Sequence, residues 1–276
     1  MASRIYDQII LFGDSQFEHG DLLVGLLQTA YQHKLEVVKR GFSGYTTREA
    51  RAIVPHVFQR SDQREVGGKA ALVVVWFGTN DAKLKGTSQH RPVSEFEGNM
   101  KAMLQEIEER CGAGVPILVL TPAPCLDSLS IPSKHNTTAA SQEISGAGVK
   151  LVAGLSKSNV KPVEMMRMLD DAKKRFNGLH DYIVEDGLHI RPEGYHWIFQ
   201  TLMEAISTHF PSLKPWHLPR VMADYTHIVG EEVPLPRPVD TLAPQRLPAQ
   251  GYKPRFAEHD LTTFDARARE LLSDGK

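Results

Sequence analysis

The sequence has little that would point to a secreted or membrane-bound protein. Its 276 residues include only two cysteines, Cys111 and Cys125, whose positions suit neither a disulfide framework nor a metal-binding motif. We expect both to be reduced thiols. No apolar run approaches the roughly 20 residues that cross a bilayer, and the N-terminal stretch lacks a signal-peptide core. We therefore expect a cytoplasmic chain without a membrane span.

Charge and glycine patterns argue against two further classes. The net charge is −1 at pH 7, and no basic run carries interleaved aromatic residues, so we expect no nucleic-acid partner. The chain has no complete glycine-rich loop of the kinds that cradle nucleotide phosphates, which argues against a nucleotide-binding protein. The oligomeric state is left open by the sequence.

Strand-length apolar runs alternate with amphipathic segments along most of the chain. Strands are expected at about 8–12, 35–39, 71–77, 117–120 and 160–163. Helices are expected at about 22–31, from a capping box at Thr46, from a second capping box at Ser94, weakly at 148–156, and at 192–210. Residues 126–145 are expected to form a long loop or lid. The alternation predicts an α/β domain with a parallel sheet and helices on both faces.

The C-terminal part differs in composition. Six of the 21 residues from Pro234 to Pro254 are proline, which favours an extended stretch, and a short helix is expected near 261–272. We therefore predict a domain over residues 1–233, with its core at about 5–210, and a proline-rich extension over 234–276.

Four polar stretches stand at the ends of expected strands or in loops on the same side of the sheet. They are GDSQ from Gly13, GFSGY from Gly41, FGTNDA from Phe77 and DGLH from Asp186. Open α/β sheets bind their ligands at the carboxyl ends of their strands. Brought together, the four stretches contain the parts of an acyl-transfer site.

Two of these stretches offer a nucleophile and its base, each with an ordinary structural alternative. Ser15 is either a nucleophile that needs a base or the N-cap of the following helix. Asp186 and His189 are spaced so that one loop can hold the carboxylate against one imidazole nitrogen and leave the other facing Ser15. The alternative is an unspecialised loop with a solvated aspartate.

The other two stretches offer oxyanion donors. The Asn80 side chain either points an N–H at a developing oxyanion or forms an Asx-turn that ends the strand. Gly44 either lends its backbone N–H or is a plain turn glycine. GFSGY also nearly matches the G-x-S-x-G elbow, but Tyr45 replaces the last glycine and only two strands precede Ser43, so Ser43 is not the expected nucleophile.

In this order and spacing, the four stretches resemble the GDSL, or SGNH, hydrolases over about residues 5–210. The longer segments RGFSGYTTREA, FGTNDA, VSEFEGNMKAML and DGLHIRPEGY are similar to the isoamyl acetate-hydrolysing esterases of that family. HFPSLKPWHLPRVMADY, from His209, also resembles their C-terminal part.

The resemblance implies a three-layer α/β/α flavodoxin-like fold with a five-stranded parallel sheet. It also implies a serine esterase that uses no metal or cofactor and acts on a small-molecule ester. In this family Ser15 would be the nucleophile and first oxyanion donor, and Gly44 and Asn80 would complete the oxyanion hole. His189 would act as base and then as acid, and Asp186 would orient it.

The chain departs from the family pattern beside the expected nucleophile. Gln16, the fourth residue of GDSQ, stands where the family usually has isoleucine or leucine, and Phe17-Glu18-His19 follows it. Phe17, Phe42 and Tyr45 either form an apolar wall for a short acyl or alcohol chain or simply pack in the core.

Short acyl esters are the expected substrates, but the motifs leave other functions open. A lysophospholipase, a thioesterase or a sugar-ester deacetylase would carry the same four stretches. A non-catalytic scaffold that uses the proline-rich extension to bind a partner is the alternative outside the hydrolases.

Overall fold

The computed structural model describes residues 6–58, 68–129 and 136–221, and in these ranges the strands form one sheet. The strands are β1 (Asp7–Gly13), β2 (Leu35–Gly41), β3 (Ala70–Trp76), β4 (Ile117–Leu120) and β5 (Val160–Val163). Their order is β2-β1-β3-β4-β5, and all neighbours pair in parallel. This is the order of flavodoxin-like sheets. The expected α/β class and the five expected strands are confirmed.

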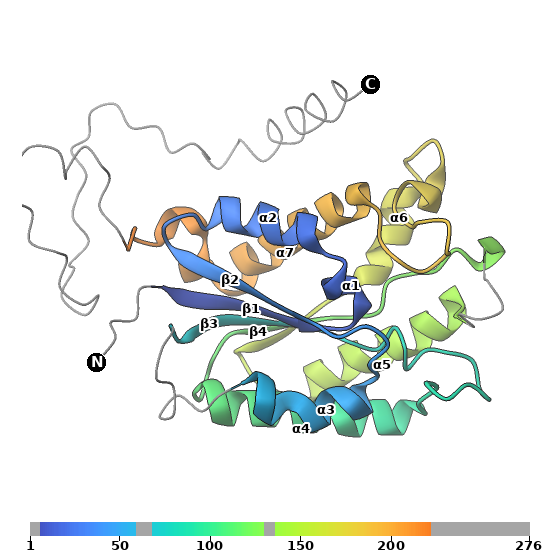
Figure 1. Cartoon of the computed structure of the whole chain (residues 1–276), viewed down its shortest axis with the longest axis horizontal. Coiled ribbons are helices and arrows are strands. Elements are labelled where there is room, and N and C mark those ends of the chain that lie inside the picture. The colour runs from blue at the N-terminus through green and yellow to red at the C-terminus, as the bar shows by residue number, and fades with distance from the viewer. Residues whose placement is uncertain (1–5, 59–67, 130–135, 222–276) are drawn as a thin grey trace, which may run out of the picture.

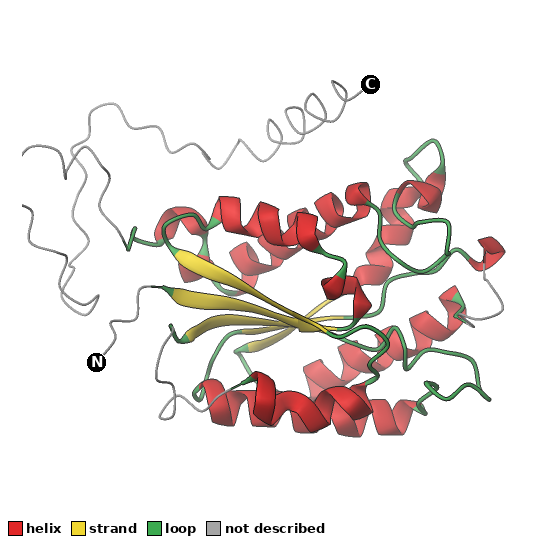
Figure 2. Cartoon of the chain, in the orientation of Figure 1, coloured by secondary structure: helices red, strands yellow, loops and turns green. Residues whose placement is uncertain are grey.

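Helices cover both faces of the sheet and make three layers (Figures 1 and 2). They are α1 (Ser15–Glu18), α2 (Asp21–Ala30), α3 (Thr47–Val57), α4 (Val93–Cys111), α5 (Thr138–Gly154), α6 (Met168–Ala172) and α7 (Pro192–His209). Short 3₁₀ turns lie at Asp127–Leu129, Met165–Arg167, Gly178–Asp181, Pro211–Leu213 and Pro215–His217. Helices α2 and α7 cover one face, and α3, α4 and α5 cover the other. No helix in the described ranges is long and apolar enough to span a bilayer.

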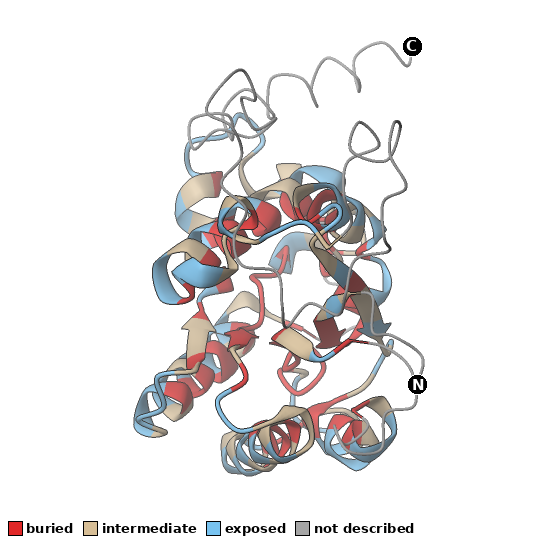
Figure 3. Cartoon of the chain, turned by 90° about the vertical axis from the view of Figure 1, so that its left-hand side faces the viewer, coloured by how far each residue is buried: buried red, intermediate tan, exposed pale blue. Residues whose placement is uncertain are grey.

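The hydrophobic core has two halves because side chains alternate across each strand. In β1, Ile9 and Leu11 pack with α2 and α7, whereas Ile10 and Phe12 pack with α3 and α4. The helices turn their buried residues toward the sheet and their exposed residues outward (Figure 3). Each fully buried large apolar side chain contributes about 1.5–3 kcal/mol, so a sheet buried on both faces provides much of the stability.

Of the two expected capping boxes, one is confirmed and one is wrong. Thr46 caps α3, and the side chain of Glu49 closes the box on the Thr46 backbone. Helix α4 instead begins at Val93 after Pro92, and no side chain caps it. Glu95, in the first turn of α4, forms an ion pair with Arg48 on α3, with 2.7 Å between Nε and Oε1.

The long loop expected at 126–145 is wrong over its second part, because α5 begins at Thr138 rather than near 148. Thr137 is the N-cap and accepts a hydrogen bond from the Ala140 N–H at 3.1 Å. The inward face of α5 includes small side chains, which weaken the apolar periodicity that would reveal a helix. These small buried residues are Ser141, Ser145, Ala147 and Gly148.

The proline-rich extension and the expected helix near 261–272 lie outside the described residues. The proposed domain boundary at 233 therefore stays a prediction. Helix α7, expected at 192–210, is confirmed, with proline at its first position.

Candidate active site

The register of the sheet brings three of the four polar stretches to the same level. Gly13, at the end of β1, pairs with Gly41 of β2 on one side and with Trp76 of β3 on the other. The stretches that follow these residues therefore leave the sheet at its carboxyl edge, next to one another. Strand order reverses at β1 and β3, and ligands of open α/β sheets bind at such a switch point.

Ser15 is the first residue of α1, and Asp14 before it is the N-cap. Asp14 Oδ1 accepts a hydrogen bond from the Gln16 N–H at 3.0 Å. The capping alternative for Ser15 is therefore wrong, because Asp14 fills that role. Gly13 is required here, since a Cβ on it would lie 2.5 Å from the carbonyl oxygen of Trp76.

Two buried aspartates lie beneath this edge of the sheet. Burial raises the pKa of Asp14 to about 7, because the carboxylate loses its water, and the nearby Asp81 raises it further. Burial also raises the pKa of Asp81 to about 6, although hydrogen bonds from Thr47 oppose the shift. The Thr47 N–H lies 3.1 Å from Asp81 Oδ2 and its hydroxyl bonds Oδ1, so Asp81 joins the FGTNDA stretch to the start of α3.

The DGLH stretch folds as a tight loop around its aspartate. Asp186 Oδ1 accepts hydrogen bonds from the backbone N–H groups of Leu188 at 2.8 Å and His189 at 2.9 Å. Asp186 Oδ2 lies 2.5 Å from His189 Nδ1. Gly187 has a φ of +76°, a left-handed conformation that favours glycine. The ordinary-loop alternative is wrong, because this loop aims both polar atoms of the carboxylate at named partners.

His189 links this loop to the start of α1. Its Nε2 lies 2.9 Å from Ser15 Oγ, across 174 residues of sequence. With Asp186 as a carboxylate, Nδ1 carries the ring proton, and Nε2 is left to accept from the Ser15 hydroxyl. The side chains of His189 and Asp186 are 23% and 21% exposed, so the pair is partly shielded but reachable.

Gly44 and Asn80 lie in adjacent loops on the same edge. Gly44 is exposed and has a φ of +78°, so its turn requires glycine whatever else it does. The Asn80 Nδ2 donates to the Tyr45 carbonyl at 2.9 Å, and Asn80 Oδ1, the atom that accepts in an Asx-turn, instead lies 3.4 Å from Gln89 Nε2. An amide carries two N–H donors, so a second one remains for another acceptor.

Ser43 is held by its neighbours in a structural position. Its backbone N–H donates to Glu18 Oε2 at 2.5 Å, and hydrogen bonds from Ser43 lower the pKa of Glu18. Glu18 thereby ties the GFSGY turn to α1. The histidine of DGLH lies at Ser15 and not at this serine.

The unusual Gln16 of GDSQ is buried and contacts the histidine loop. Its side-chain Nε2 donates to the Leu188 backbone carbonyl at 3.0 Å, and the backbone carbonyl of Gln16 accepts from the Tyr195 hydroxyl at 2.6 Å. The residue that departs from the family pattern thus connects α1 to the loop before His189. His19, from the same segment, packs edge-on against the His189 ring with 5.1 Å between centroids.

The structure does not bring the three expected wall aromatics together. Phe17 is 1% exposed and packs edge-on against Trp76 on the α2–α7 side of the sheet. Phe42 and Tyr45 stack with 5.4 Å between centroids and pack against the opposite half of the core. For Phe17 the packing alternative is therefore the better description.

Sequence reasoning missed Gln89, which lies in the loop between β3 and α4. Its Nε2 donates to the Gly44 carbonyl at 2.5 Å and lies 3.4 Å from Asn80 Oδ1. Neither its spacing nor its neighbours carried a signal, because these contacts join segments that are distant in sequence. Among the described residues, no three His, Cys, Asp or Glu side chains are grouped so that they could hold a metal ion.

Comparison with protein families gives a match over most of this domain. The model of the GDSL-like lipase/acylhydrolase family matches residues 11–197. The chain belongs to this family. The matched range of this GDSL-like chain includes Ser15, Gly44, Asn80, Asp186 and His189.

Relatives of the GDSL-like chain match about four fifths of it. A GDSL esterase/lipase of Arabidopsis thaliana is 27% identical over an alignment 245 residues long, and the match covers 81% of this chain and 94% of the relative. The isoamyl acetate-hydrolyzing esterase 1 homolog of Mus musculus is 28% identical over an alignment 225 residues long, and the match covers 79% of this chain and 88% of the relative. The GDSL-like chain is a carboxylic ester hydrolase.

A solved structure has the same fold. The lipase/acylhydrolase of Enterococcus faecalis superposes with a TM-score of 0.57 at 18% identity, and the match covers 79% of this chain and all of that one. The three-layer fold of the GDSL-like chain is thus confirmed by comparison as well as by its own topology.

Proposed function

We propose that the chain hydrolyses esters of short acyl groups through a covalent acyl-enzyme on Ser15. The observation that carries the proposal is the contact of 2.9 Å between Ser15 Oγ and His189 Nε2, backed by Asp186 on the other ring nitrogen. A serine hydroxyl becomes an effective nucleophile when a base removes its proton, and this pair supplies such a base.

Acylation begins when Ser15 Oγ attacks the ester carbonyl and His189 Nε2 takes its proton. The negative charge on the carbonyl oxygen is then stabilised by the N–H groups of Ser15 and Gly44 and by the Asn80 side chain. Preorganised donors of this kind are worth roughly 3 kcal/mol each in the transition state. Asp186 stabilises the protonated imidazole that forms.

The tetrahedral intermediate breaks down when the bond to the alcohol oxygen cleaves. His189 gives its proton to the departing alcohol and is neutral again. Water then attacks the acyl-enzyme while His189 takes one of its protons, and the carboxylic acid leaves as Ser15 recovers its proton. Activity is expected to fall at acidic pH, because a protonated His189 cannot accept the proton of Ser15.

The preference for short acyl groups rests on the similarity to an esterase named for isoamyl acetate. The stacked rings of Phe42 and Tyr45 lie in the loop that carries Gly44, and they offer an apolar surface beside the proposed oxyanion hole.

The test is hydrolysis of p-nitrophenyl esters from acetate to decanoate by the wild type and by Ser15→Ala. We expect the wild type to prefer acetate and Ser15→Ala to lose activity by several orders of magnitude, because the nucleophile is gone. The exposed Ser94→Ala is the matched control and should behave as wild type.

A fluorophosphonate probe separates the remaining outcomes. It should label the wild type and not Ser15→Ala. Full activity in Ser15→Ala would overturn the proposed nucleophile, and preference for decanoate would overturn the short-chain assignment. A wild type that neither hydrolyses an ester nor reacts with the probe would favour the scaffold alternative.

A further inference from the structure

The turn that carries the Gly44 N–H is held on both sides by side chains from other elements. Before it, the Ser43 N–H donates to Glu18 of α1. After it, the Gly44 carbonyl accepts from Gln89 Nε2 at 2.5 Å. The peptide group that bears the Gly44 N–H therefore lies between two anchored neighbours, and its direction depends on both.

Gln89 also contacts the second proposed oxyanion donor. Its Nε2 lies 3.4 Å from Asn80 Oδ1, while Asn80 Nδ2 donates to the Tyr45 carbonyl. With the amide oxygen of Asn80 directed at Gln89, its NH₂ group must lie on the other side. One glutamine amide, which has two N–H donors, thus orients both Gly44 and Asn80.

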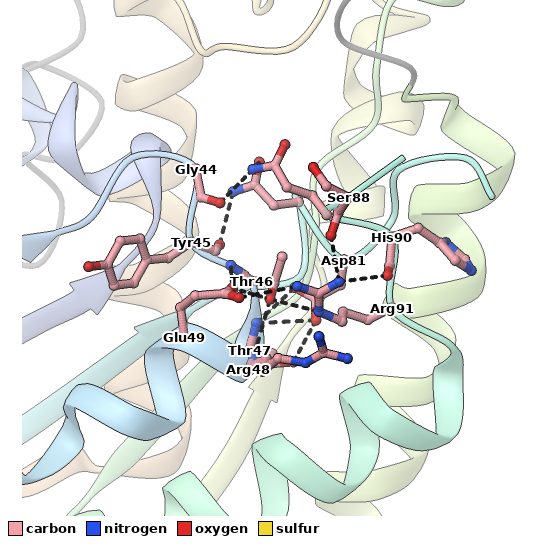
Figure 4. A network of polar contacts seen from close by, with 12 residues as sticks. Gly44, Tyr45, Thr46, Thr47, Arg48, Glu49, Asp81, Ser88, His90 and Arg91 are labelled. Carbon is pink, nitrogen blue, oxygen red and sulfur yellow. Dashed lines mark hydrogen bonds and ion pairs between the residues drawn. The ribbon is translucent and has the colours of Figure 1, made fainter. Parts of the chain in front are cut away.

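The position of Gln89 is itself well determined. Its Oε1 accepts from the Lys83 ammonium, so its amide nitrogen is directed toward Gly44. The buried guanidinium of Arg91 donates to the carbonyls of Ser88 at 2.8 Å and His90 at 2.9 Å, on either side of Gln89. Figure 4 shows this loop facing the Gly44–Tyr45 backbone.

We propose that Gln89 is a positioning residue that sets the geometry of the oxyanion hole by donating to Gly44 and to Asn80. The inference rests on the proposed function, because it concerns how the same site stabilises charge. Gln89 would touch no substrate atom. Its effect would come from preorganisation, and a displacement of about 1 Å at such a site can reduce the rate by about 100-fold.

The test is Gln89→Glu, which keeps the shape of the side chain but replaces the donor with an acceptor. The new carboxylate would face the Gly44 carbonyl and Asn80 Oδ1, while its attraction to Lys83 would keep the loop in place. We expect kcat/KM to fall by about 10- to 100-fold, almost entirely through kcat. The melting temperature should stay near that of the wild type.

A second measurement isolates the oxyanion hole. A trifluoromethyl ketone with the preferred acyl chain forms a hemiketal oxyanion on the serine, so its Ki should rise by about the same factor as kcat/KM falls. Gln89→Met, which is uncharged and of similar length, should show the same direction if Gln89→Glu folds poorly. Gln105→Glu on the exposed side of α4 is the matched control and should leave kcat/KM and Ki unchanged, with only a small fall in melting temperature because it loses its hydrogen bond to Glu109.

The inference would be overturned if Gln89→Glu and Gln89→Met both kept the kcat/KM and the Ki of the wild type. A loss that appears only in KM and melting temperature, with Ki unchanged, would also overturn it, because it would show a purely structural role. Failure of the proposed function is seen separately, as an inactive wild type or a fully active Ser15→Ala.

Discussion

At the scale of single residues, the site depends on polar groups that lie out of water. Asp14 is fully buried beside Ser15, and its Oδ2 has no hydrogen-bond partner among the described residues. Burying an ionised carboxylate without full compensation is unfavourable, so the carboxyl retains its proton to higher pH. Asp14 therefore titrates at a higher pH in the folded protein than in the unfolded chain.

This titration predicts a pH-dependent stability that Asp14→Asn removes. Between pH 3.8 and about 7 the folded state holds a proton on Asp14 that the unfolded chain has lost, so stability falls as the pH rises through this window. Asparagine caps helices as well as aspartate and does not titrate. The measurement is the free energy of unfolding in urea at pH 5 and at pH 8. From the lower to the higher pH, the wild type should lose on the order of a few kcal/mol more than Asp14→Asn loses.

Asp170→Asn is the control for that experiment. Asp170 is exposed, and its ion pair with Lys173 lowers its pKa, so its contribution is present above pH 3.8 and lost only below that. The substitution should therefore not change how the free energy of unfolding varies between pH 5 and pH 8. If the free energy of unfolding of the wild type and of Asp14→Asn changed equally with pH, Asp14 would ionise normally in the folded protein.

At the scale of secondary-structure elements, α3 and α4 begin in different ways. The side chain of Thr46 accepts from the Arg48 N–H at 3.3 Å and from Arg91 Nε at 3.1 Å, so it serves the helix and the loop beside it. Helix α4 has no side-chain cap, and its N-terminus is set by Pro92.

Thr46→Ala should therefore destabilise the protein, whereas Ser94→Ala should not. Loss of a cap costs about 0.5–2 kcal/mol, and the upper part of that range is expected here because the buried Arg91 also loses an acceptor. Ser94 is exposed and caps nothing, so its removal should change the free energy of unfolding by less than about 0.5 kcal/mol. Equal effects in chemical denaturation would contradict this difference.

At the scale of the whole molecule, the candidate site exists because several segments approach closely at one edge of the sheet. A Cβ on Gly41 would lie 2.3 Å from the backbone nitrogen of Glu18, so the end of β2 touches the backbone of α1 directly. In contrast, a Cβ on Gly25 of α2 would meet nothing within 4 Å.

Substitution of these two glycines by alanine should have opposite effects. Gly41→Ala forces α1 away from β2, which should cost about 1–3 kcal/mol and lower kcat because Ser15 begins that helix. Gly25→Ala should stabilise the protein by about 0.5–1 kcal/mol, since glycine inside a helix is unfavourable. Thermal unfolding of both variants checks the stability changes, and ester hydrolysis checks the fall in kcat. A neutral Gly41→Ala would show that the contact is relaxed easily.

Local patterns predicted the features that one segment decides by itself. The apolar run of β3, the capping box at Thr46 and the proline that opens α7 each depend on near neighbours, and each is confirmed. The start of α5 was missed because its inward face is built from small residues, which give little periodic signal.

The sequence by itself determined the five strands and the longer helices between them, although it gave no sign of the short α1 and α6, and it determined which four stretches stand at the carboxyl edge of the sheet. Only the tertiary structure decided that Gln16 holds the loop of His189, that Gln89 faces Gly44, and that Phe17 packs in the core. The physical reason is the sequence separation over which each interaction acts. Periodicity and capping act over a few residues, whereas these contacts join segments up to 172 residues apart and depend on how the chain pairs its strands.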